Sequence, residues 1–262
     1  MRNVALVLEY DGGMFHGWQS QTNAATVQDA VARAIAKLEG LPPRRFTGAS
    51  RTDAGVHARA QVANFFTESR IPADKYAYAL NALFPRGVAC VRSAEAPPGF
   101  QARYSAVSKT YTYLILNRRM PSALYGDRAW HVPLPLDAGA MRDAAALIVG
   151  ERDFRAFMST GSPVKSTIRN VTRLDLDDRR PAREPFIKIS VEGDGFLYNM
   201  VRIIAGTLVY AGLGRLGPGD VETALASGDR KAAGKTAPPQ GLCLESVSYG
   251  AELDRIIYGA DD

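Results

Sequence analysis

Residues 45–67 read RFTGASRTDAGVHARAQVANFFT, and this stretch predicts a strand, a loop and a second strand in direct succession. The ends, 45–49 and 61–67, carry the apolar and aromatic residues that favour strands. The middle, Ser50–Ala60, contains Gly55 and other small residues that favour a loop. With the elements on either side, the pattern predicts a mixed α+β fold whose strands need not be parallel.

The sequence before and after this stretch alternates strands with helices. A capping box at Thr26-Val27-Gln28-Asp29 predicts the start of an amphipathic helix that ends at Glu39. The N-terminal part also predicts strands Val4–Tyr10 and Val88–Ser93 and a helix from about Asp74 to Phe84. The segment from Pro97 to Tyr104 is the best candidate for a linker.

After this segment the alternation of strands and helices starts again. The predicted strands are Lys109–Asn117, Val171–Asp177, Phe186–Glu192 and Leu242–Tyr249. The predicted helices are Asp137–Val149, an apolar helix Phe196–Gly212 and a short helix near Asp220–Ser227. We therefore expect two domains, residues 1–104 carrying the loop and residues 105–262 completing the fold.

The composition is that of a folded protein with an acidic partner or substrate. The 262 residues are 46% hydrophobic and 23% charged, which is enough to bury a core. The net charge of +5 favours nucleic acid, although enzymes of small anionic metabolites are equally basic. Cys90 and Cys243 lie far apart and predict free thiols in a reducing cytosol. The cysteines and three histidines have no metal-ligand spacing, so we expect no zinc site.

No segment predicts a leader or a membrane span. The apolar run Val4–Leu8 is too short for the core of a signal peptide. The run Phe196–Gly212 is below the usual spanning length and carries Arg202 near its middle. We therefore expect a cytoplasmic protein with no membrane partner.

The loop Ser50–Ala60 is the first candidate for chemistry. It places Arg51, Asp53 and His57 among residues with little side chain, which leaves Asp53 room to meet a substrate. Alternatively, Asp53 only bonds the amides of its own loop in a turn. The residues alone leave both interpretations open.

Arg202 is the only charged residue of the predicted helix Phe196–Gly212. A buried guanidinium needs a partner, because an unpaired buried charge costs several kcal/mol. Asp53 is a candidate for this partner, and Glu245 and Asp194 are alternatives. A purely structural arginine is the remaining interpretation.

The strand Lys109–Asn117 begins with a basic residue and two tyrosines on one face. Period-two alternation places Lys109, Tyr111 and Tyr113 together. Such a face suits unstacked RNA bases, which stack on rings and meet cations. Ordinary core tyrosines are the simpler alternative.

At these residues the chain resembles the tRNA pseudouridine(38–40) synthase family. The resemblance is collinear and covers nearly the whole chain. It is carried by Tyr10-Asp11-Gly12, Phe15-His16-Gly17-Trp18-Gln19, the run Thr47 to His57, Ala102-Arg103, Lys109 to Tyr113, Asp153-Phe154, Gly195-Phe196-Leu197, Asn199-Met200-Val201-Arg202, Thr236-Ala237-Pro238 and Gly241-Leu242. Arg152 departs from the family, in which many members have histidine before the Asp-Phe pair, and this leaves any role of that position in doubt.

The resemblance implies two related α/β domains with mainly antiparallel sheets joined into one extended sheet, helices on the outer face and a central basic cleft. It implies an isomerase that converts uridine to pseudouridine at positions 38, 39 and 40 of the tRNA anticodon stem-loop. It also implies a homodimer without metal or cofactor. By carry-over, Asp53 is catalytic, Tyr111 stacks on the uracil, Arg202 pairs with Asp53, and Leu244 lines the base pocket. Arg51 is a candidate contact to the phosphate or the flipped nucleotide.

Several alternatives remain open at this level. Asp53 is able to attack C1′, to attack C6 of the base, or to accept a 2′ proton. A non-catalytic tRNA-binding or RNA-binding protein using the same cleft is the rival function. A glycoside hydrolase needs a second placed carboxylate, which the sequence does not offer, and a metal-dependent nuclease needs an acidic cluster that is likewise missing from the sequence.

Overall fold

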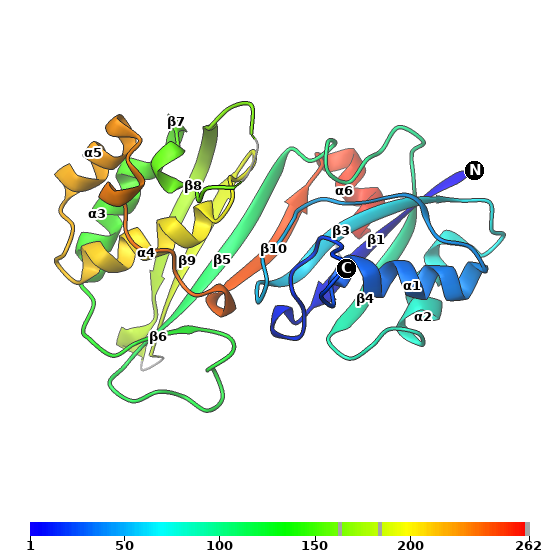
Figure 1. Cartoon of the computed structure of the whole chain (residues 1–262), viewed down its shortest axis with the longest axis horizontal. Helices are drawn as coiled ribbons and strands as arrows, with labels where there is room; N and C mark the ends of the chain where they lie inside the picture. The colour runs from blue at the N-terminus through cyan, green and yellow to red at the C-terminus, as the bar shows by residue number, and fades with distance from the viewer. Residues whose placement is uncertain (162–163, 183–184, 260–262) are drawn as a thin grey trace. The chain divides into compact units, whose positions relative to one another are not determined.

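The computed structural model describes residues 1–161, 164–182 and 185–259, and the chain divides into two compact units (Figure 1). Unit 1 comprises Met1–Lys109 together with Leu244–Asp262, and unit 2 comprises Thr110–Cys243. The segment from Leu244 to Gly259 therefore groups with the N-terminal residues. The functional division at residue 104 stays a prediction.

Unit 1 is a sheet with helices on it. Its strands are β1 (Arg2–Tyr10), β2 (Arg44–Gly48), β3 (His57–Thr67), β4 (Val88–Ala96) and most of β10 (Leu242–Ser248). Its helices are α1 (Val27–Glu39), α2 (Tyr76–Asn81) and α6 (Ala251–Tyr258). Strand β1 lies between β3 and β4 and is antiparallel to both. Its residues Asn3 to Leu8 are buried in succession, so both faces of the sheet are covered there.

Helices lie on opposite faces of this sheet. Ser93 of β4 pairs with Leu6, and its hydroxyl accepts an amide N–H of α2 at 2.9 Å. The neighbouring Arg92 pairs with Val7, and its guanidinium lies beside Gly259 at the end of α6. Because successive side chains of a strand point to opposite faces, α2 covers one face and α6 the other (Figure 1). This packing of α6 on β1 and β4 explains why the C-terminal segment belongs to unit 1.

The helix predicted from the capping box is confirmed as α1. The hydroxyl of Thr26 accepts the amide of Asp29 at 3.2 Å and donates to the carboxylate of Asp29 at 2.6 Å. Gly40 ends the helix in the left-handed region, at φ 76°. The apolar stripe that predicted the helix is its buried face: Val27, Ala30, Val31, Ala34 and Ile35.

The predicted linker, residues 97–104, is wrong as a linker because it is packed into unit 1. Ala102 is completely buried. Its amide donates to the Asn64 side chain, and its carbonyl accepts the Tyr249 hydroxyl, both at 2.9 Å. Asn3 donates to two further carbonyls of the segment. Buried polar side chains thus satisfy a backbone that has no secondary structure of its own.

Unit 2 contains the remaining strands and helices. The strands are most of β5 (Ser108–Asn117), together with β6 (Trp130–Val132), β7 (Gly150–Asp153), β8 (Ile168–Asp178) and β9 (Phe186–Gly193). The helices are α3 (Ala138–Ile148), α4 (Met200–Gly212) and α5 (Pro218–Ser227). Along β9, buried Ile187, Ile189 and Val191 alternate with partly exposed residues, so one face of the sheet is covered. Helix α3 packs against β8 and α4.

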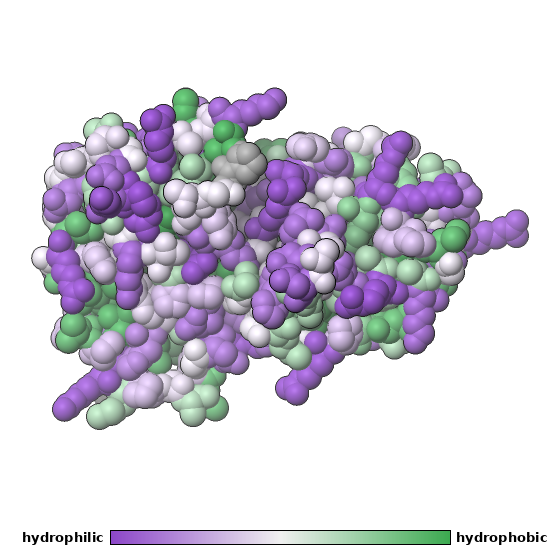
Figure 2. Space-filling model, in the orientation of Figure 1, coloured by the Kyte–Doolittle hydropathy of each residue, from purple (hydrophilic) through white to green (hydrophobic). Residues whose placement is uncertain are grey.

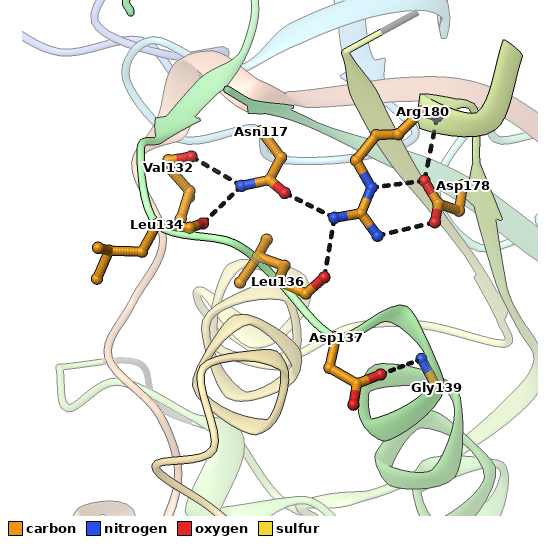
Figure 3. A network of polar contacts seen from close by, with 8 residues as sticks. All are labelled: Asn117, Val132, Leu134, Leu136, Asp137, Gly139, Asp178 and Arg180. Carbon is orange, nitrogen blue, oxygen red and sulfur yellow. Dashed lines mark hydrogen bonds and ion pairs between the residues drawn. The ribbon is translucent and has the colours of Figure 1, made fainter. Parts of the chain in front are cut away.

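Figure 3 shows how Arg180 holds the connection between β6 and α3. Its Nε and Nη2 donate to the two carboxylate oxygens of Asp178 at 2.7 and 2.8 Å. Its Nη1 donates to the Asn117 side chain and to the Leu136 carbonyl at 2.7 and 2.8 Å. Asn117 in turn donates to two backbone carbonyls of the same connection. These hydrogen bonds hold the connection up to Leu136, the residue before Asp137, and Asp137 caps the N-terminus of α3.

Across the described residues, hydrogen-bonded strands follow the order β4-β1-β3-β10-β5-β9-β8-β7, with β2 beside β3 and β6 beside β5. This is a ten-stranded sheet. Strand β1 pairs antiparallel with β3 and β4, as do β2 with β3, β7 with β8 and β8 with β9, whereas β5 pairs parallel with β6. The predicted α+β class with a mainly antiparallel extended sheet is confirmed. The central basic cleft stays a prediction.

The apolar helix begins later than predicted. The sequence predicts a helix from Phe196, but α4 begins at Met200. Asn199 before it takes a left-handed conformation at φ 62°, which interrupts helical geometry. Strands β6 and β7 and helix α6 were not predicted; β6 has only three residues. In the described part of the chain, no helix is long and apolar enough to cross a membrane.

Candidate active site

Asp53 lies in the loop between β2 and β3, two antiparallel neighbours. The amide of Val56 donates to the Asp53 carbonyl at 3.1 Å, which closes a tight turn over residues 53–56. Gly55 occupies the position with positive φ, 80°, which side chains with a Cβ rarely adopt. Asp53 is half-buried and Arg51 is exposed. Asp53 and Arg51, the two site residues predicted in this loop, are therefore both at least partly accessible to solvent.

The segment 15–18 holds this loop by its backbone. The Trp18 amide donates to the Thr52 carbonyl at 3.0 Å, and the Gly55 amide donates to the Phe15 carbonyl at 3.4 Å. The Tyr10 hydroxyl and the Thr52 hydroxyl are 2.7 Å apart and hydrogen-bonded. Asp53 is thus flanked on both sides by residues whose positions are determined by another segment.

Two glycines permit this close approach. A Cβ on Gly12 would lie 2.1 Å from the Val56 carbonyl oxygen. A Cβ on Gly17 would lie 2.6 Å from the Thr52 carbonyl oxygen. Side chains at these positions would displace the loop that carries Asp53. Chemical reasoning from the sequence did not find Tyr10, Gly12, Gly17 or Trp18 as loop supports, and only their place in the family resemblance pointed to them.

The chain that leaves β2 and enters the loop is also held by side chains. The Gln61 amide group bonds both the amide and the carbonyl of Ser50, at 3.1 and 2.6 Å. The Lys109 ammonium donates to the Ala49 carbonyl at 2.7 Å. Burial, and secondarily the positive charge of Arg103, lower the pKa of Lys109 to about 8.

His57 is buried beside the first turn of the chain. Its Nδ1 accepts the Gly12 amide at 3.1 Å and lies 3.2 Å from a carboxylate oxygen of Asp11. When Nδ1 accepts the Gly12 amide, it carries no proton and the contact with Asp11 is not an ion pair; an ion pair with Asp11 needs the protonated ring, which cannot accept that amide. These contacts favour the expected role of His57 as an organiser of the loop.

Tyr111 is buried in β5 and packs against Phe196. The two ring centroids are 5.3 Å apart and the rings are perpendicular, at 89°. Phe196 precedes α4 and is available for this contact because the helix begins only at Met200. Tyr113, on the same strand face, is fully buried and donates its hydroxyl to the Pro238 carbonyl at 2.7 Å. Tyr113 is therefore a tyrosine of the core, which agrees with the alternative interpretation of this strand face as ordinary core tyrosines.

Arg202 lies in the first turn of α4, and its orientation is determined by two acceptors. Its Nε donates to the Ala237 carbonyl at 2.8 Å and its Nη1 donates to the Asn199 side chain at 2.7 Å. The Arg202 carbonyl accepts the Ala237 amide at 3.0 Å. The segment around Ala237 therefore contacts both the backbone and the side chain of Arg202.

A close glycine contact brings that segment to the helix. A Cβ on Gly206 would lie 1.7 Å from the Lys235 carbonyl oxygen. A Cβ on Gly234 would lie 2.6 Å from the Thr207 backbone. The Gly234 amide also donates to the Thr207 hydroxyl at 2.9 Å. The position of the Arg202 side chain thus depends on residues one turn further along α4.

The other acids considered for Arg202 have partners elsewhere. Glu245 pairs with Arg59 at 3.3 Å. Asp194 accepts the Asn170 amide at 3.1 Å in the turn after β9. The pairing of Arg202 with Asp53 stays a prediction.

The predicted site residues come from both units. Asp53, Arg51 and Leu244 belong to unit 1, and Tyr111 and Arg202 belong to unit 2. Leu244 is completely buried in β10, and this burial is compatible both with a place in the core and with the lining of a pocket. Among the described residues, no group of three or more His, Cys, Asp or Glu side chains is arranged to hold a metal ion. Figure 2 shows many hydrophilic side chains projecting from the visible face.

Comparisons with known proteins give a consistent result. The family model described as "tRNA pseudouridine synthase" matches residues 6–105 and 144–250. These ranges contain Arg51, Asp53, Arg202 and Leu244, whereas Tyr111 lies between them.

Curated relatives match over most of their length. "tRNA pseudouridine synthase A" of Thermoanaerobacter sp. (strain X514) is 48% identical over 95% of this chain and 100% of its own. The protein of the same name from Acetivibrio thermocellus is 47% identical with the same coverage. A solved structure, "Crystal Structure of a Cbf5-Nop10-Gar1 Complex", matches 92% of this chain and 49% of that chain, at 12% identity and a TM-score of 0.40.

The family model covers well over half of the chain, and the curated relatives are far above 30% identity along almost its full length. The loop that carries Asp53, its supports at Gly12 and Gly17, and the first turn of α4 all lie within the matched ranges. The chain belongs to the tRNA pseudouridine synthase family.

Proposed function

We propose that this chain is an isomerase that converts uridine into pseudouridine in tRNA, at positions 38, 39 and 40 of the anticodon stem-loop. The observation that carries the proposal is the intact Arg51-Thr52-Asp53 loop inside the range matched by the family model. The relatives that match 95% of the chain are named "tRNA pseudouridine synthase A".

The reaction itself explains why a single carboxylate and no redox cofactor are sufficient. The N1–C1′ bond of uridine breaks and a C5–C1′ bond forms, while the C5 proton leaves and N1 gains a proton. Substrate and product are isomers, so no electrons are gained or lost. Asp53 acts at C1′, at C6 of the base or on the 2′ proton, and each of these steps needs an ionised carboxylate.

Arg202 and Tyr111 serve Asp53 and the base in this proposal. A guanidinium paired with Asp53 favours its charged form and holds its rotamer through two parallel bonds. The acceptors at Ala237 and Asn199 support this role because they orient the guanidinium. Tyr111 stacks on the uracil and is a candidate for removal of the C5 proton, and Leu244 lines the base pocket.

The substrate must leave its stack before it reacts. Enzymes that act on a base in a stem extract the nucleotide, which costs a few kcal/mol and is offset by contacts in the pocket. Arg51 is exposed on the Asp53 loop and suits a contact to the phosphate or to the flipped nucleotide. We further propose that the protein works in the cytoplasm as a homodimer.

Pseudouridine mapping on unmodified tRNA tests the function. Wild type is expected to modify positions 38–40, whereas Asp53→Asn binds the tRNA without product, a loss of at least about 10³-fold. Asp74→Asn is the matched control, since Asp74 is an exposed acid that contacts Lys75. Binding without any product in wild type would support the rival, a non-catalytic tRNA-binding protein. Turnover by Asp53→Asn would exclude Asp53 as the essential carboxylate.

A further inference from the structure

The Lys109 side chain is a part-buried cation whose protein partner is neutral. Its ammonium donates to the Ala49 carbonyl at 2.7 Å. Among the described residues it forms no ion pair with a carboxylate. An ammonium has three N–H donors, so two remain for another acceptor. Burying a charge without a counter-ion is unfavourable, which indicates that an anion is the missing partner.

A second cation lies near Lys109. The positive charge of Arg103 acts on Lys109 and lowers its pKa. Arg103 is exposed, and its guanidinium lies over the Tyr104 ring, 5.5 Å from the centroid. In the part of the chain that the structure describes, Arg103 also has no carboxylate partner. Two neighbouring cations repel each other, and an anion bound between them removes the repulsion.

The backbone that carries Arg103 and the side chain of Lys109 are both held by protein contacts. The backbone before Arg103 is bound through Ala102 to the buried side chains of Asn64 and Tyr249. Lys109 is the second residue of β5, and its ammonium donates to the carbonyl of Ala49, the residue directly before the loop of Asp53. Lys109 therefore has a defined position beside the start of that loop, which suits a site that recognises a ligand by geometry.

We propose that Lys109 and Arg103 bind one backbone phosphate of the RNA substrate, and that Lys109 links this phosphate to the position of the Asp53 loop. The inference rests on the proposed function and adds a substrate contact to it. The exposed Tyr104 ring beside Arg103 offers a neighbouring surface on which a base can stack. Neither Lys109 nor Tyr111 lies in the ranges matched by the family model.

The site has a distinctive dependence on pH. Burial and Arg103 hold the pKa of Lys109 at about 8, and a bound phosphate raises that pKa by favouring the charged form. RNA binding therefore takes up a proton above about pH 8 and weakens as the pH rises. On β10, the neighbour of β5, Glu245 pairs with Arg59 of β3. The loop adds Arg51 and Asp53, and neither is among the causes of the Lys109 shift.

The experiment measures the Kd for unmodified tRNA by wild type and by three variants. Lys109→Met is expected to weaken binding about tenfold and to lower the slope of log Kd against log salt by about 0.7–0.9. Lys109→Arg keeps the charge and retains most of the affinity. Lys75→Met removes an exposed lysine that contacts Asp74 and is expected to bind as wild type does.

The pH dependence of the affinity for tRNA distinguishes two roles of Lys109: binding an RNA phosphate, or only supporting the Ala49 backbone. Between pH 6.5 and 8.5 wild type is expected to weaken about fourfold more than Lys109→Arg, because only lysine loses its proton in this range. RNA with a neutral methylphosphonate at one position near the target uridine gives a second measurement. Wild type should lose affinity at one such position, whereas Lys109→Met should not.

The outcomes are distinct from those that test the proposed function. Wild type that forms pseudouridine, with Lys109→Met showing the same Kd, salt slope and response to methylphosphonate, would overturn the phosphate site alone. The phosphate site would also be overturned if Lys109→Met lost only stability or turnover, because Lys109 would then only support the Ala49 backbone. Absence of product from wild type would instead count against the proposed function.

Discussion

Arg180 and Arg202 are both part-buried arginines of unit 2, and they differ in how far along the sequence their partners lie. Each guanidinium donates to an asparagine side chain and to a backbone carbonyl. Arg180 also holds both oxygens of a carboxylate only two residues away, Asp178. The contact of Arg202 with Ala237 instead spans 35 residues of sequence.

The difference separates a local structural ion pair from a site assembled by the tertiary fold. Asp178 raises the pKa of Arg180, and Arg180 lowers the pKa of Asp178, so the pair is stabilised by its own charges. The Arg202 side chain is oriented by the Ala237 carbonyl, which is remote in sequence, and by the Asn199 side chain. We therefore expect substitutions at Arg202 to change the reaction and substitutions at Arg180 to change stability.

Arg202→Lys is expected to have the largest effect. Lysine keeps the charge but lacks the planar fork that bonds Ala237, Asn199 and a carboxylate at the same time. The single-turnover rate of pseudouridine formation should fall by about 10²–10³-fold, while tRNA binding and unfolding change little. Arg215→Lys, at the end of α4 and over the Tyr210 ring, is the control. A wild-type rate for Arg202→Lys would mean that the guanidinium has no special role.

Gly206→Ala tests whether Arg202 depends on the segment that contacts α4. The new Cβ would lie 1.7 Å from the Lys235 oxygen, so the backbone near Ala237 must move. We expect the free energy of unfolding to fall by about 3 kcal/mol and the rate to fall about tenfold. Urea denaturation and the single-turnover rate measure the two effects.

Gly219→Ala is the matched control because a Cβ at that position of α5 meets no atom within 4 Å. Its stability should stay the same or rise by about 0.5 kcal/mol, since alanine favours the helix. If Gly206→Ala retained both stability and rate, the close contact between α4 and the 234–237 segment would not position Arg202.

Arg180→Met should destabilise the protein without affecting the reaction. It leaves Asp178 and the Leu136 carbonyl without their partner, and we expect a loss of about 2 kcal/mol in the free energy of unfolding. The rate per folded molecule should stay within about twofold of wild type. Arg179→Met removes the exposed contact with Asp177 and should cost at most about 0.5 kcal/mol.

The pH dependence of stability identifies the charge pair as the cause. The pKa of Asp178 is lowered in the folded state, so its stabilisation is present above the unfolded value of 3.8 and is lost as the pH falls through the folded pKa. The stability gap between wild type and Asp178→Asn should be constant from pH 7 to 5 and should shrink below about pH 4. A gap that stays constant at low pH would show that hydrogen bonds alone hold the connection.

Local patterns predicted most of the secondary structure. The Thr26 capping box and the apolar stripe predicted α1, because both depend on contacts within four residues. The start of α4 was wrong because a single residue, Asn199, takes a left-handed conformation that the apolar run does not signal. The segment 97–104 was wrong because its backbone is satisfied by Asn3, Asn64 and Tyr249, which are remote in sequence.

In the candidate site, too, local patterns predicted some features, and contacts between remote segments determined the others. Residue types and their order, together with the family resemblance, identified Asp53, Tyr111 and Arg202. The supports of the site were not predicted, since each depends on a close approach between remote segments. Gly12 lies against Val56 and Gly206 lies against Lys235, and no local pattern signals either contact.

The sequence by itself determined the α+β class, the family and the chemical identity of the candidate catalytic residue, because these depend on residue types in order. Only the tertiary structure decided which side chains hold the Asp53 loop, how the Arg202 guanidinium is oriented and which residues surround Lys109. These features depend on burial and on hydrogen bonds between residues that are remote in sequence, which no local pattern of the sequence predicts.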